Sequence, residues 1–133
     1  MATSLEELKE LAKGQEVEII GWSEEPFVCR LKRPSMLNMV ASEQIPNPLL
    51  NAAYIMFNGS KNTKDIVSMK EQRELFTIMA KAAMVDPTYS QLEEIGLELT
   101  DVQLMEIWNY TQIGVKGLFS FRTKQQDIKN IKN

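Results

Sequence analysis

The segment DIVSMKEQRELFTIMAKAAMV, residues 65–85, sets the pattern that the rest of the chain must accommodate. Ile66, Met69 and Phe76 recur at helical spacing in its first half, and its second half is almost wholly apolar. It contains neither glycine nor proline, and Pro87 follows shortly after it. We therefore expect a central helix of roughly 30 Å that stops before Pro87. This helix should be exposed at its start and surrounded by other elements along its second half.

The composition is typical of one globular domain. The chain has 133 residues, a hydrophobic fraction of 44%, a charged fraction of 25% and a net charge of −3. We expect a single domain over residues 1–122 and a flexible polar tail over residues 123–133. The acidic net charge argues against partners such as nucleic acid or an anionic membrane.

We expect a cytoplasmic protein. The first residues have neither the basic start nor the apolar run of an export signal. No stretch of about 18 apolar residues is present to span a membrane. The single cysteine, Cys29, has no second cysteine in the chain to pair with, which fits a reducing compartment.

Catalytic and metal sites are disfavoured by the residue types present. The chain has no histidine, which removes the commonest general base and the commonest ligand for zinc or copper. The carboxylates lie in groups that solvated helix faces and turns explain, and no glycine-rich phosphate loop is present. We therefore expect no enzyme activity, no metal and no cofactor.

Methionine is unusually frequent, with 8 in 133 residues. Because its side chain is flexible and polarisable, it fills irregular gaps in a core and also adapts to varied apolar partners. Core filling is the more common role of these residues, and a methionine-lined binding surface is the alternative.

The first third of the sequence predicts a short helix and a β-hairpin. Ser4 and Glu7 form a capping box, and the amphipathic helix that follows stops at Gly14. Apolar and polar residues then alternate over residues 16–33, with a turn around Pro26, and Cys29 is expected inside a strand. Two strands are unstable alone, so the hairpin should lie against helices.

The remaining sequence predicts further helices. Short helices are expected from residue 36 to about 42, over residues 49–57, and after a cap at Ser90. The polar loop 59–63 should be mobile, and a capping box of Thr100 and Gln103 should open a helix that reaches residue 115. The predicted fold is α+β and mainly α-helical. In it, the N-terminal helix and the hairpin pack on a bundle of about five helices around the central long helix.

The only basic run lies at the end of the hairpin and contains Arg30, Lys32 and Arg33. On a strand, Arg30 and Lys32 share a face that could contact phosphate. An exposed hairpin face is the commoner explanation of such a pattern. Both interpretations stay open at the level of sequence.

Three segments together resemble the tail assembly chaperones of long-tailed bacteriophages and prophages of Gram-positive bacteria. They are EVEIIGWSEEPFVCRLKRPSMLNMVASEQIPNPLL (16–50), LTDVQLMEIWNY (99–110) and GLFSFR (117–122). The similar pattern is a hairpin that exits through Arg33, Pro34 and Ser35 towards an Ile-Pro-Asn-Pro turn (45–48). The resemblance implies a helical body and no catalytic motif.

The resemblance also implies a function and partners. Such chaperones bind the long tape measure protein, keep it soluble and help the tail tube protein to polymerise around it. They form oligomers in the cytoplasm of the bacterial host. They are made in a short form and in a longer, frameshifted form, of which this chain would be the short one.

The residues and the resemblance agree on an interaction protein. Candidate partner contacts are Met36, Met39, Trp108 and Phe119, with a structural role for each as the alternative. Self-association is expected through the hairpin edge or through the helix within residues 99–115. The rival hypothesis is a nucleic-acid-associated regulatory or adaptor protein that uses the basic run described above.

Overall fold

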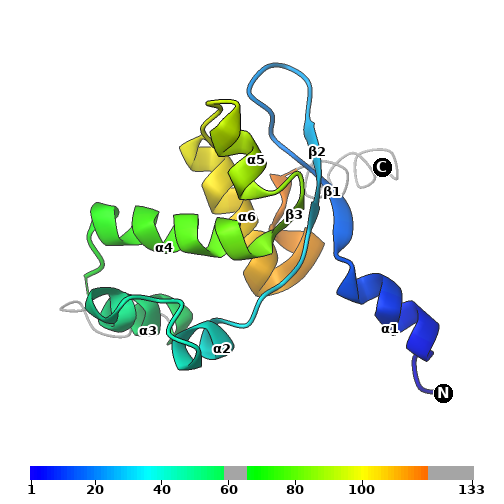
Figure 1. Cartoon of the computed structure of the whole chain (residues 1–133), viewed down its shortest axis with the longest axis horizontal. Coiled ribbons are helices and arrows are strands. Elements are labelled where there is room, and N and C mark those ends of the chain that lie inside the picture. The colour runs from blue at the N-terminus through cyan, green and yellow to red at the C-terminus, as the bar shows by residue number, and fades with distance from the viewer. Residues whose placement is uncertain (59–65, 120–133) are drawn as a thin grey trace, which may run out of the picture.

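The computed structural model describes residues 1–58 and 66–119 (Figure 1). Within these ranges the fold is α+β, with a small antiparallel sheet on one side and helices on the other. The mixed, mainly helical character predicted from the sequence is confirmed. The predicted mobile loop 59–63 and the predicted tail 123–133 lie outside the described residues.

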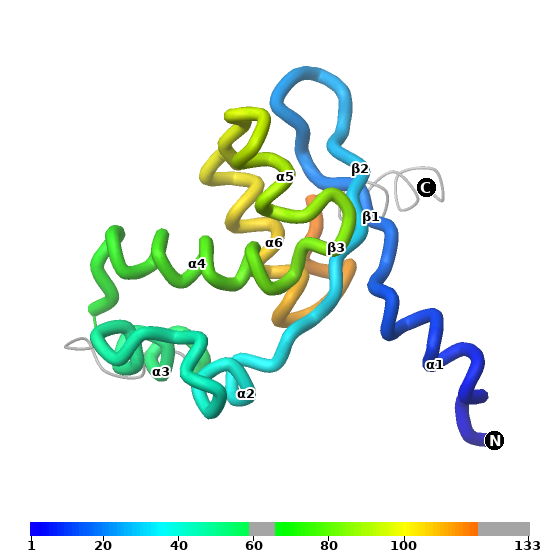
Figure 2. Tube along the Cα trace, viewed as in Figure 1, coloured from blue at the N-terminus to red at the C-terminus, as the bar shows by residue number. Residues whose placement is uncertain are grey.

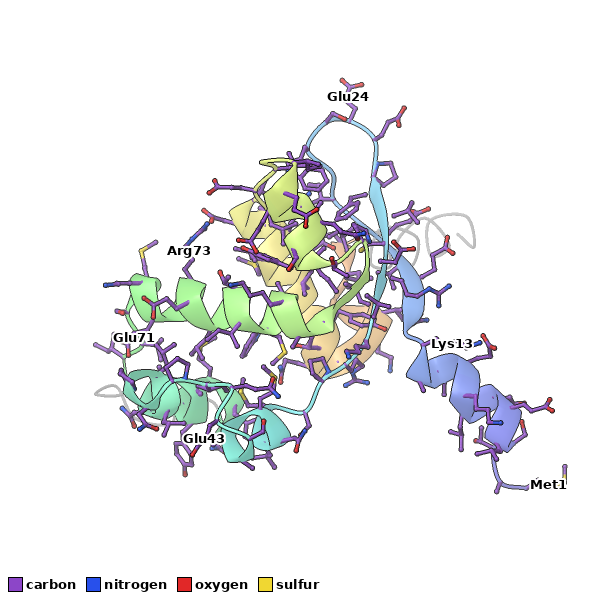
Figure 3. The ribbon with its side chains drawn as sticks, in the orientation of Figure 1. Met1, Lys13, Glu24, Glu43, Glu71 and Arg73 are labelled. Atoms are coloured by element: carbon purple, nitrogen blue, oxygen red, sulfur yellow. The ribbon has the colours of Figure 1, made fainter. Side chains whose placement is uncertain are left out.

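The sheet has three strands in the order β1-β2-β3. Strands β1 (Gln15–Ile19) and β2 (Phe27–Leu31) form the predicted hairpin, in which Val17 faces Cys29. The residues on one face, among them Val17 and Cys29, are buried, as the alternating pattern requires. The turn end of this hairpin extends beyond the helices, with Glu24 at its tip (Figure 3).

The third strand, β3 (Met84–Asp86), was not predicted, because residues 84 and 85 were assigned to the central helix. The chain leaves its helical path at Met84, which has φ −75° and ψ 119°. At this point the backbone carbonyl of Ala83 accepts a 2.9 Å hydrogen bond from the N–H of Lys32. Pairing with β2 satisfies the backbone groups here in place of another helical turn.

The central helix is therefore shorter than predicted. Helix α4 spans Met69–Ala83, and it begins where Ser68 and Glu71 form a reciprocal capping box. Its buried residues are Leu75, Met79, Ala80 and Ala83, so the expectation of one exposed and one buried end is confirmed.

Helix α6 (Asp101–Ile113) crosses α4 and is equally central (Figure 1). The predicted capping box of Thr100 and Gln103 is present at its start. Seven of its residues are buried, including the polar side chains of Gln103, Glu106 and Thr111. After α6 the chain turns at Gly114 into the short 3-10 helix η2 (Gly114–Gly117).

Three short helical segments form a layer on the side of α4 opposite to α5 (Figure 1). They are α2 (Met36–Ala41), η1 (Asn47–Leu49) and α3 (Leu50–Asn58). Helix α5 (Tyr89–Glu94) lies between β3 and α6, and Thr88 caps it rather than the predicted Ser90. The other helices thus lie around the α4–α6 pair, and the predicted arrangement of a five-helix bundle is not confirmed.

Two apolar clusters fill the interior. One lies between the sheet and the α4–α6 pair, and the other lies between α4 and the α2–α3 layer. Helix α4 contributes Ala80 and Ala83 to the first cluster and Leu75 and Met79 to the second. The helix therefore joins two halves of one core.

The N-terminal helix α1 (Leu5–Ala12) does not pack on the body as predicted, since none of its residues is buried. Its trace runs away from the other elements (Figure 2). Gly14 sets this direction: its φ is +91°, and a Cβ atom there would lie 2.8 Å from the carbonyl oxygen of Leu31. Arg30 also donates a 2.9 Å hydrogen bond to the Gly14 carbonyl. Amphipathicity alone did not reveal that the described part of the chain buries no residue of this helix.

No helix in the described part of the chain combines the length and apolarity needed to cross a membrane.

Candidate protein-binding groove

An apolar groove of about 560 Å³ lies between the first turns of α4 and α6. Phe76 and Leu104 line its inner part, and Met69 and Met105 line it closer to solvent. Met69 is 86% exposed and Met105 is 44% exposed. Methionine side chains that remain in water at the edge of a groove suit contact with a partner of variable shape.

Two capped helix starts position this groove. The Ser68 and Thr100 capping boxes begin α4 and α6, and residues of the first turns of both helices line the groove. Arg73 on α4 and Asp101 on α6 then form an ion pair at 2.9 Å, and Figure 3 shows Arg73 extending from α4. Because both side chains are well exposed, the pair contributes little to stability, and its main effect is to place charge beside the groove.

The inner wall of the groove is anchored in the core. The rings of Phe76 and Trp108 are tilted towards each other with centroids 5.1 Å apart. Such aromatic pairs contribute about 0.5–1.5 kcal/mol beyond their buried area. The groove therefore has a fixed apolar base and flexible methionine edges.

A buried polar connection holds α6 against the end of the hairpin. Glu106 accepts hydrogen bonds from the backbone N–H groups of Ile20 at 3.0 Å and Phe119 at 3.3 Å. Gln103 donates to the carbonyl of Ile20 at 3.0 Å. Both backbone groups of Ile20 are thus satisfied by side chains of α6. The sequence did not reveal this role of Glu106, because an isolated glutamate in a helix is usually solvated.

Cys29 lies in the core beside this connection. Burial, and then the nearby Glu106 carboxylate, raise the pKa of the Cys29 thiol to about 12. The thiol is therefore neutral at physiological pH, and a neutral thiol is a poor nucleophile. The sequence-based expectation of a buried strand residue is confirmed for Cys29.

Three of the four predicted partner contacts lie in the interior. Met36, Met39 and Trp108 belong to the apolar cluster between α4 and the α2–α3 layer. For these three residues the structural role, which was the alternative, is the one that the structure supports. Phe119 is partly exposed at the end of the described chain. The apolar face of α6, proposed for self-association, is likewise buried, whereas β1 is an edge strand.

The three basic residues do not form one free cationic surface. Arg30 donates to the carbonyl of Gly14. Arg33 donates to the carbonyls of Thr111 at 3.3 Å and Gln112 at 2.7 Å, where it caps the end of α6. The Lys32 side chain alone is exposed without a hydrogen bond of this kind among the described residues. Two of the three cations therefore have a structural role.

Among residues 1–58 and 66–119, no group of three or more acidic or cysteine side chains is placed to hold a metal ion.

Comparison of the chain with protein-family models, with curated proteins and with solved structures finds no match in any of the three.

Proposed function

We propose that the chain is a phage tail assembly chaperone that binds the tape measure protein in the α4–α6 groove and keeps it soluble while the tail tube assembles. The observation that carries this proposal is the exposure of Met69 and Met105 along a groove between two helices. The resemblance to tail assembly chaperones supplies the identity of the client. The activity is binding in the host cytoplasm and needs no catalysis.

The groove suits a helical client. A helix that places apolar residues at every third or fourth position presents one narrow stripe, which fits a groove between two helices. The edges at Met69 and Met105 adapt to side chains of different size. Of the charged lining residues Lys70, Arg73 and Asp101, the last two pair with each other. The apolar stripe can therefore accept many positions along a long repetitive helix.

The experiment is co-expression with the tape measure protein that is proposed as the client, and the measured quantity is the amount of soluble client. Substitutions Met69→Glu and Met105→Glu place charge in the groove without touching a buried residue. Leu37→Glu is the matched control, because Leu37 is an exposed apolar residue on α2, outside the groove. We expect the wild type and the Leu37→Glu control to increase the amount of soluble client. The variant that carries Met69→Glu and Met105→Glu should not increase it.

The salt dependence separates this proposal from the nucleic-acid alternative. Apolar burial is not screened by salt, so the client complex should survive moderate salt. Phosphate binding instead weakens steeply as salt rises. A client that is equally soluble with and without the chain, or salt-sensitive retention on DNA that is lost in Lys32→Ala, would contradict the chaperone proposal.

A further inference from the structure

Among residues 1–58 and 66–119, nothing buries the apolar face of the amphipathic helix α1. Leu5, Leu8 and Leu11 form one stripe and are 69%, 47% and 65% exposed. An isolated helix of eight residues is marginal in water even when it is capped as here by Ser4. Its leucine stripe therefore needs a surface to cover it.

The chain's own groove cannot provide that surface. Only Lys13 and Gly14 separate α1 from β1, and two residues span at most about 7 Å. Gly14 is held by Arg30 and by close contact with Leu31. In Figure 2, α1 lies on the opposite side of the molecule from the start of α4, where the groove is.

The groove of a second copy matches α1 in length. Eight residues of α-helix extend about 12 Å. The α4 side of the groove runs from Met69 to Phe76, which is about 10 Å of helix. Leu5, Leu8 and Leu11 have the spacing by which a helix inserts one face into such a groove.

The charges also match. Helix α1 carries three glutamates, Glu6, Glu7 and Glu10, against one lysine, Lys9. The groove has Lys70 and Arg73 on its α4 side, against Asp101 on α6. Glu7 is next to the leucine stripe on the helical wheel, so it would approach the cationic side of the groove.

We infer that α1 of one copy docks in the α4–α6 groove of another copy, so that the tape measure client must displace α1 to bind. The contact joins two different surfaces, and it therefore builds a head-to-tail chain or a ring. Only the displacement step rests on the proposed function, because self-association needs no client.

The test uses two variants that each lack one half of the contact. The arm variant carries Leu8→Glu and Leu11→Glu, and the groove variant carries Met69→Glu and Met105→Glu. All four positions are exposed, so neither variant disturbs the core. Leu37→Glu is the control. Sedimentation velocity over a range of concentrations gives the mass of each species.

We expect the wild type and the control to grow in mass with concentration, and each variant alone to remain monomeric. An equimolar mixture of the two variants should form a dimer and stop there, because only one intact arm and one intact groove remain. Lys70→Glu should weaken the affinity between copies about two- to five-fold. Adding Glu7→Lys, so that the opposite charges are exchanged across the contact, should restore that affinity.

Three results would overturn the inference: a monomeric wild type, a groove variant that still associates, or a mixture that forms no dimer. The second result would indicate pairing of α1 with α1. The client assay then separates the two claims. Suppose that the mixture of variants dimerises but neither variant changes the amount of soluble client. The self-association would then stand, and the proposed function would be contradicted. If both claims hold, the arm variant should bind client more tightly than the wild type does.

Discussion

Ile20 and Glu106, 86 positions apart in the chain, are joined by a 3.0 Å hydrogen bond from the backbone N–H of Ile20 to the Glu106 carboxylate. Strand β1 ends at Ile19, where its pairing with β2 also ends. The backbone N–H of Ile20 therefore has no partner in the β1–β2 register. A side chain of α6 takes the place of that partner. The register between the hairpin and the helices is thereby fixed by one buried glutamate.

Substitution of Glu106 should destabilise the fold according to the number of acceptors removed. Glu106→Gln keeps one acceptor oxygen, but its amide NH2 group faces one of the two backbone N–H donors, Ile20 or Phe119. This substitution should lower the free energy of unfolding by about 1–3 kcal/mol. Glu106→Leu leaves both N–H groups unsatisfied and should cost more. Urea unfolding measures both, with exposed Glu94→Gln as the control. A Glu106→Leu variant as stable as the wild type would show that the connection is dispensable.

Two methionines of α4 should differ widely in their effect on stability. Met79 is 1% exposed, so Met79→Ala should cost about 2–5 kcal/mol through lost burial and a cavity. Met69→Ala, at the exposed start of the same helix, should change the free energy of unfolding by less than about 0.5 kcal/mol. Chemical denaturation of both variants checks this, and equal effects would contradict the observed burial.

Cys29 should be unreactive while the protein is folded. Its thiol is buried and has a pKa of about 12, so at pH 8 almost no thiolate is available to attack a disulfide reagent. We expect labelling at least about 100-fold slower in the native protein than in urea. Rapid labelling under native conditions would mean that strand β2 opens readily.

Arg33 and Lys32 should differ in their structural role although they are neighbours. Arg33→Ala removes the donors to two carbonyls at the end of α6 and should cost about 1–2 kcal/mol. Lys32→Ala removes an exposed side chain and should be nearly neutral. Thermal unfolding distinguishes them. If Lys32→Ala were the more destabilising change, the assignment of the cap to Arg33 would be wrong.

The parts of the fold that could be predicted from sequence depend on short-range signals. The Thr100–Gln103 capping box and the β1–β2 hairpin are each specified by residues close together in the chain. The start of α4 was placed too early, at residue 65, because apolar spacing outweighed the cap at Ser68. Helical periodicity also correctly indicated which end of α4 is buried.

The parts that could not be predicted depend on long-range pairing. Strand β3 exists only because residues 84–86 meet β2, which an isolated segment cannot indicate. Trp108 and Met39 were candidates for a binding surface because they lie on short or late elements, yet tertiary packing buries both. The groove edges, Met69 and Met105, carry no local signal beyond their residue type, and their exposure follows from how α4 crosses α6.

The division of the core into two clusters that share α4 has a consequence for the order in which the protein opens. The α2–α3 layer contributes its buried residues to the cluster on one side of α4, and the sheet contributes its buried residues to the other cluster. The amide hydrogens of the α2–α3 layer should therefore exchange through a partial opening, at a lower free energy than those of β1 and β2. Such an opening would bare the α2–α3 side of α4 while the sheet, α6 and the far side of α4 stayed folded as a unit.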